Sequence, residues 1–164
     1  MSAADTPPLS PELRDAIAEA AAHHGGPRAA MVESLRMIQQ AHGWVSDAHL
    51  EEAAALLGVS TAEIEDVATF FSLIFRRPVG EKLILLCDGA SCWLNGGEDV
   101  RDAVMARLGI GFGETTADGQ YTLINICCVG GCDHAPAAVI GRDRKLVGPL
   151  SPGDLDALLG EDAR

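Results

Sequence analysis

The sequence predicts an α+β protein in which a helical bundle, residues 10–78, is followed by an α/β domain with a short mixed sheet, residues 79–164. In the first part, apolar residues recur at the spacing of one helix face. After Val79 the pattern changes to short apolar runs typical of strands, separated by helical stretches. This change of period places a domain boundary near Val79. Residues 1–9 precede the first helix signal and are expected to form a flexible tail.

Capping signals divide the first domain into four expected helices. Ser10 followed by Pro11 is typical of a helix start, and the glycine pair at 25–26 with Pro27 ends that helix. The second helix carries Met31, Leu35 and Ile38 on one face and stops at Gly43; the third runs from Ser46 to Leu57. The fourth begins at Ser60 in a capping box with Glu63 and is expected to continue until Pro78, with Ile64, Val67, Phe71 and Ile74 on its buried stripe.

The second domain reads as a small sheet covered by helices. The continuous apolar run at 83–86 is typical of a strand that is covered on both faces. The expected elements are, in order, a strand at 83–86, a helix at 95–108, strands at 121–127, 137–140 and 145–147, and a terminal helix from Ser151 to near Leu159. We therefore expect a small α/β sandwich.

Charge and composition exclude several classes of partner. The 164 residues include 12 Lys and Arg against 24 Asp and Glu, a formal charge of -12. Nucleic acid and anionic membranes are disfavoured, because both are bound by clustered basic residues. The longest apolar run, Leu83–Cys87, is too short to span a bilayer, and no secretory signal is apparent, so we expect a cytoplasmic protein without membrane insertion. In the cytoplasm, we expect the five cysteines to be metal ligands or redox-active groups rather than to form disulfides.

Two pairs of cysteines are the candidate functional residues of this sequence. Cys87 and Cys92 follow one expected strand, and Cys128 and Cys132 follow another. Four converging thiolates would repel one another unless a cation joined them, so the pattern indicates a metal centre, either zinc or an iron-sulfur cluster. Gly89, Gly130 and Gly131 lie inside the two loops, where their backbone N–H groups can approach sulfur. Such donors favour the iron-sulfur alternative without excluding zinc.

The segments Cys87-Asp-Gly-Ala-Ser-Cys92-Trp-Leu-Asn-Gly96 and Cys128-Val-Gly-Gly-Cys132-Asp-His-Ala-Pro136 resemble the thioredoxin-like [2Fe-2S] subunit of NADH dehydrogenases. That family comprises the small peripheral iron-sulfur subunit of respiratory complex I and its relatives in NAD-dependent formate dehydrogenases and NAD-linked hydrogenases. Val67-Ala-Thr-Phe-Phe71, followed by Pro78-Val-Gly80, also resembles the family's segment between its helical and ferredoxin-like parts.

The resemblance implies a thioredoxin-like fold and one [2Fe-2S] cluster, with Cys87 and Cys92 on one iron and Cys128 and Cys132 on the other. It also implies a non-catalytic electron-transfer subunit that sits against a larger FMN- and NADH-binding subunit of the same oxidoreductase complex. The sequence departs from the family at Ser91, Asn95 and residues 65–66, and Cys127 is additional, but the ligand set is intact.

Two other functions remain open from the residues. A zinc-stabilised interaction module would use the same four cysteines. A thiol-disulfide oxidoreductase is weakened because the sequence has no Cys-x-x-Cys pair. Among the neighbouring residues, Cys127 is expected to pack as a small apolar side chain, and His134 to lie outside the ligand set. Pro136 is compatible with a cis or a trans peptide bond.

Overall fold

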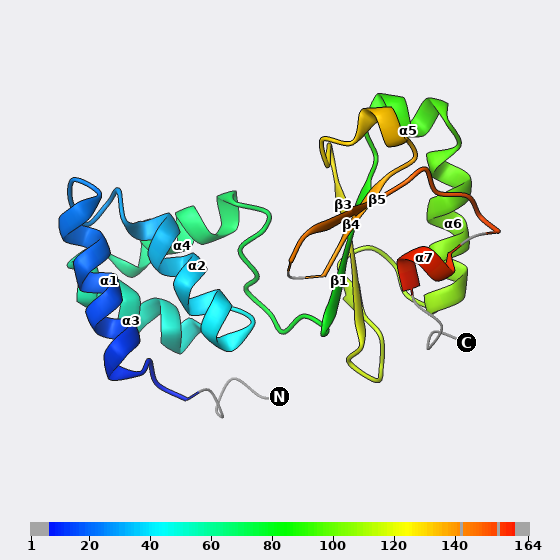
Figure 1. Ribbon diagram of the computed structural model, residues 1–164. Coiled ribbons are helices and arrows are strands. Elements are labelled where there is room, and N and C mark those ends of the chain that lie inside the picture. Colours follow the sequence, from blue (N-terminus) through cyan, green and yellow to red (C-terminus); the bar gives the residue numbers. More distant parts are fainter. Residues whose placement is uncertain (1–6, 142, 154, 160–164) are drawn as a thin grey trace. The chain divides into compact units, whose positions relative to one another are not determined.

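The computed structural model describes residues 7–141, 143–153 and 155–159. It divides the chain into two compact units, Met1–Pro78 and Val79–Arg164. The first unit is built from helices, and the second from a sheet with helices beside it (Figure 1). Among the described residues, no helix has both the length and the apolar composition needed to cross a bilayer.

Serine caps start three of the four helices in the first unit. The side chains of Ser10, Ser46 and Ser60 each accept a hydrogen bond from the backbone N–H three residues later. The capping box of Ser60 with Glu63 is complete, which confirms the expected helix start. The helices are α1 (Pro11–His23), α2 (Met31–His42), α3 (Asp47–Leu57) and α4 (Thr61–Phe70).

The expectation that α4 continues towards Pro78 is wrong, because the helix ends at Phe70. Phe71 is extended and 41% exposed, so it does not belong to the buried stripe. The Gln39 side chain explains where the chain goes instead. Its Nε2 donates to the carbonyl oxygen of Leu73 at 2.8 Å, and its Oε1 accepts from the N–H of Phe75 at 2.6 Å. These bonds satisfy backbone groups that a longer helix would have used.

The core of the first unit lies between its four helices. Burying each large aliphatic side chain stabilises the unit by roughly 1.5–3 kcal/mol. Leu9 belongs to this core and is 2% exposed, in contrast to the tail expected over residues 1–9. Residues 1–6 lie outside the described part of the chain. The fully buried members on the helices include Ile17, Leu35, Ile38, Leu50 and Ile64.

A pair of histidines is packed between α2 and α3. The rings of His42 and His49 lie 4.2 Å apart, and His49 Nε2 donates to the carbonyl oxygen of Pro7 at 2.9 Å. Within the described part of the chain, His42 Nε2 and His49 Nδ1 are buried without a hydrogen-bond partner. Burial, followed by the neighbouring His49, lowers the pKa of His42 below its usual value of 6.5, against a smaller opposing effect of Glu52.

Because of the His42 and His49 pair, we expect the protein to lose stability in mild acid. Because the pKa of His42 is lower in the folded state, the unfolded chain binds more protons as the pH falls through 6.5, and the free energy of unfolding decreases. The free energy of unfolding is measured by urea titration at about pH 8 and about pH 5.5, with the spectroscopic signal of the helices as the readout. We expect His42→Gln to reduce this pH dependence, whereas His23→Gln, at an exposed position, retains it. An unchanged pH dependence in His42→Gln would refute the assignment.

The second unit contains one five-stranded sheet with the order β2-β3-β1-β4-β5. β1 pairs in parallel with β3, and all other neighbours are antiparallel. All four expected strands are thereby confirmed, and the short β2 is an additional strand between the expected helix at 95–108 and the expected strand at 121–127. The strands are β1 (Lys82–Cys87), β2 (Glu114–Thr115), β3 (Tyr121–Ile126), β4 (Ala138–Ile140) and β5 (Lys145–Val147).

Two helices, α6 (Gly97–Leu108) and α7 (Asp156–Leu159), share a core with the sheet. Val100 and Val104 of α6 belong to the same buried cluster as Ile84 and Leu123 of the central strands. β3 is further tied to α7 because the Tyr121 hydroxyl donates to the carbonyl oxygen of Leu159 at 2.5 Å.

The helices of the second unit differ from the expectation in two places. The predicted helix at 95–108 begins at Gly97 and is preceded by a separate one-turn helix, α5 (Ala90–Leu94). Gly96, with a φ of +88°, separates the two, and this left-handed conformation is one that glycine adopts without strain. The terminal helix begins at Asp156 instead of Ser151, and residue 154, within the expected span, lies outside the described residues.

Candidate metal centre

The two cysteine pairs start from the same edge of the sheet. β1 ends at Cys87, which is in register with Ile126, the last residue of the parallel strand β3. The N–H of Asp88 donates to the carbonyl oxygen of Ile126 at 3.0 Å, so the two chains are still paired as they leave the sheet. Because the carboxyl ends of parallel neighbours coincide, the loop after Cys87 and the loop after Ile126 begin side by side.

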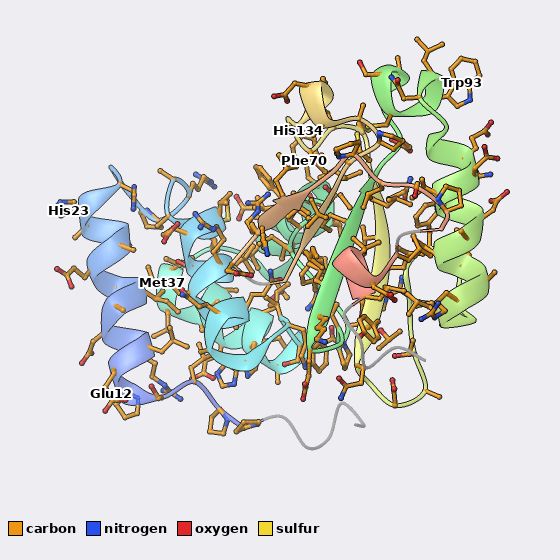
Figure 2. The ribbon with its side chains drawn as sticks, turned by 45° about the vertical axis from the view of Figure 1, so that its right-hand side comes forward. Glu12, His23, Met37, Phe70, Trp93 and His134 are labelled. Atoms are coloured by element: carbon orange, nitrogen blue, oxygen red, sulfur yellow. The ribbon has the colours of Figure 1, made fainter. Side chains whose placement is uncertain are left out.

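The first loop turns Cys92 back towards Cys87 through α5. Cys87 and Cys92 are 7% and 1% exposed and belong to one buried cluster with Ala137. Helix α5 begins after Gly89, and its short length explains why the sequence pattern did not predict it. Its outer residues Trp93 and Leu94 are exposed, and Figure 2 shows the Trp93 ring directed away from the sheet.

The second loop presents its two cysteines near the surface. Cys128 and Cys132 are exposed, and the N–H of Gly130 donates to Cys128 Sγ at 3.3 Å. Such a donor is the kind expected from the glycines in this loop, because it stabilises negative charge on sulfur. Cys132 opens a 3₁₀ turn, Cys132–His134, and the chain then enters β4 through a cis peptide bond at Pro136.

Contacts between the loops place the second loop against the pair formed by Cys87 and Cys92. Val129 and Ala135 of the second loop pack against the buried cluster that contains Cys87 and Cys92. Burial raises the pKa of the Cys92 thiol; its hydrogen bond with Cys87 and the proximity of Cys132 raise it further, while a backbone hydrogen bond from Ala137 opposes them. A thiol in this environment is held protonated until a cation shares its charge.

Two glycines allow the backbone to approach the cysteines closely. A Cβ at Gly89 would lie 2.7 Å from the carbonyl oxygen of Cys127 and 3.5 Å from Cys87 Sγ. A Cβ at Gly97 would lie 2.7 Å from the carbonyl oxygen of Cys92. The loops are therefore packed to backbone contact, and a side chain at either position would displace a cysteine-bearing segment.

The donor set is that of a thiolate-bound metal group. All five cysteines are free, and four of them come from two loops at one edge of a sheet. Among the described residues, no three Cys, His, Asp or Glu side chains are grouped closely enough to hold a single metal ion as they stand. Four thiols, one of which accepts a hydrogen bond from the Gly130 N–H, fit an iron-sulfur cluster in their chemistry.

Several neighbouring residues refine the sequence-based expectations. Cys127 is exposed, so the expectation that it packs as a small apolar side chain is wrong; it lies one residue beyond the end of β3. His134 is exposed, and its Nε2 lies 3.4 Å from Asp133 Oδ2; its place outside the ligand set stays a prediction. The packing roles of Val129 and Ala135 have no signal in the sequence, because they depend on how the two loops meet.

Comparisons with known proteins identify relatives over most of the chain. The family model described as thioredoxin-like [2Fe-2S] ferredoxin matches residues 17–162. The E subunit of the NADH-quinone oxidoreductase of Pseudomonas aeruginosa is 42% identical over 151 residues, which cover 92% of this chain and 90% of that protein. Its counterpart in Escherichia coli strain K12 is 42% identical over 135 residues, covering 82% of this chain and 81% of that protein.

A solved structure of an NAD+-reducing [NiFe]-hydrogenase in the H2-reduced state is also similar, with a TM-score of 0.65 and 26% identity. The match covers 76% of this chain and 21% of the hydrogenase chain, so this protein spans about a fifth of that longer chain. Together with the family match, these relatives confirm the resemblance found in the cysteine loops. The chain belongs to the thioredoxin-like [2Fe-2S] ferredoxin family: its fold is thioredoxin-like, its cofactor is a [2Fe-2S] cluster, and its chemistry is electron transfer.

Proposed function

We propose that this protein is the electron-transfer subunit of an NADH-linked oxidoreductase complex, cytoplasmic and peripheral to any membrane part of that complex. The supporting observation is that the two cysteine loops leave one sheet edge in a chain whose family match covers residues 17–162. The relatives from NADH-quinone oxidoreductases favour a complex of the NADH dehydrogenase type over a formate dehydrogenase or a hydrogenase. The partner that we propose is the larger subunit that binds FMN and NADH.

We assign the ligands within the second unit, residues 79–164, as two pairs: Cys87 and Cys92 on one iron, Cys128 and Cys132 on the other. Support comes from the direct interaction between the Cys87 and Cys92 thiols and from the packing of the second loop against them. When bound, the cluster supplies a site that takes up and releases one electron at a time.

The protein's own residues bind the irons and shape the surroundings. Cys92 is 1% exposed and is therefore shielded from water, whereas Cys128 and Cys132 lie at the surface. The Gly130 N–H stabilises negative charge on Cys128 Sγ. We assign no acid, base or nucleophile to the chain, and in this proposal NADH is oxidised on the partner subunit.

The proposed electron path is tested by reduction with NADH. In an anaerobic mixture with the FMN- and NADH-binding subunit, NADH should bleach the visible absorption of the cluster and produce a paramagnetic signal at low temperature. The protein alone should give no response to NADH but should respond to dithionite. Reduction by NADH without the flavin subunit, or no reduction in its presence, contradicts the proposal.

Substitution of the cysteines tests the ligand assignment. Cys128→Ser should lose most of the cluster absorption and lower the melting temperature, because ligation contributes free energy only in the folded state. Cys127→Ser is the matched control, since it removes the adjacent exposed thiol and should retain the spectrum. Visible absorption and iron content of anaerobically purified protein measure both. If the two variants behave in the opposite way, Cys127 is the ligand.

Close packing at Gly89 gives a second test that leaves all thiols in place. Gly89→Ala would set a methyl group 2.7 Å from the Cys127 carbonyl oxygen, and we expect a reduced iron content and faster loss of the cluster in air. Gly153→Ala is the control, because nothing lies within 4 Å of its added Cβ. Equal iron content and equal cluster lifetime in the two variants would contradict this expectation, because they would show that cluster binding does not require the close contact between Gly89 and the Cys127 carbonyl group.

A further inference from the structure

Helix α5 exposes two large apolar side chains directly beside a cysteine of the site. Trp93 and Leu94 are 57% and 74% exposed, whereas Cys92, the residue before them, is 1% exposed. The single turn therefore buries its thiol and exposes its two apolar residues, of which Figure 2 shows the Trp93 ring. An adjacent Trp and Leu exposed to this extent are uncommon on a surface that contacts only water, and Trp is enriched at the centre of protein interfaces.

The chain segments that form the site are acidic. The two segments that carry the cysteines, 83–100 and 121–141, contain no Lys or Arg. The nearest following basic residue, Arg101, is paired with Glu98 and Asp102. The exposed carboxylates of these segments are Asp88, Glu98, Asp99 and Asp133.

The structure assigns Trp93 and Leu94 of α5, with the acidic residues around them, as the surface on which the FMN- and NADH-binding subunit docks. This inference rests on the proposed function and specifies the contact made there. The partner surface that fits has an apolar recess for the Trp93 ring and a rim of Lys and Arg.

Two arguments select this occupant. Electron transfer between proteins weakens steeply with distance, so a redox partner must cover a surface that lies close to a cysteine of the site. Trp93 follows a proposed ligand directly in the sequence, and a partner that buries its ring lies next to the site. In addition, a four-thiolate cluster adds negative charge to a surface that is already acidic, and a basic rim on the partner complements that charge. A second copy of this chain, with a formal charge of -12, would repel it.

The test uses the full-length, cluster-loaded chain and the purified FMN- and NADH-binding subunit of the same organism. The dissociation constant is measured for the wild type, for Trp93→Ser combined with Leu94→Ser, and for Leu94→Ser alone. Leu56→Ser is the matched control, because Leu56 is an exposed leucine in the other unit, 38% exposed. Iron content is determined for each preparation.

We expect the double variant to bind about tenfold more weakly or worse and Leu94→Ser to show a smaller loss, both with unchanged iron content, while Leu56→Ser binds as the wild type does. Raising the salt concentration should weaken the wild-type complex, because the rim charges are then screened. If the double variant has lost iron, the dissociation constant of Leu94→Ser is used instead to judge the docking surface.

Binding of the cluster-loaded variants within twofold of the wild type would overturn the docking surface and leave the proposed function intact. Failure of the wild-type chain itself to bind the flavin subunit would overturn both. Self-association of the chain that is abolished by the Trp93 and Leu94 substitutions would show that a second copy, and not the flavin subunit, occupies the surface.

Discussion

The parallel pairing of β1 with β3 is the constraint on which the site depends. It places Cys87 and Ile126 in register, so two loops that are distant in the sequence leave the sheet at one edge. Burial at this edge raises the pKa of the Cys92 thiol, and a metal group relieves the cost of its ionisation. The same pairing that completes the sheet thus creates a site that favours a cationic metal group.

Close packing of the backbone in the loops fixes where the cysteines lie relative to the sheet. Gly89 and Gly97 let the first loop lie against the Cys127 and Cys92 carbonyl groups, where a Cβ would not fit. One turn of helix, α5, then buries Cys92 and exposes Trp93 and Leu94. The cluster site and the docking surface that we propose therefore share the same few residues.

Much of this fold could be predicted from the sequence, because its signals are local. The Ser60 capping box, the left-handed glycine at Gly43 and the apolar run at 83–86 each specify an element through neighbouring residues. The cysteine loops could be matched to a family for the same reason, since their spacing is contained in two short segments. The family match, the relatives and the sheet agree with those expectations.

The errors arose where contacts distant in sequence decide the structure. The end of α4 depends on hydrogen bonds from Gln39, more than 30 residues earlier, and the position of Leu9 depends on its burial in the helical core. Helix α5 is too short for a periodic pattern to develop. The exposure of Cys127 follows from where β3 ends, which apolar patterning locates only to within a residue or two.

Iron and acid-labile sulfide analysis of the anaerobically purified protein, combined with its low-temperature paramagnetic spectrum after reduction, tests the central claim most directly. The account predicts about two irons and two sulfides per chain and a signal from one reduced cluster. One zinc ion per chain with no labile sulfide, in colourless protein, would contradict it.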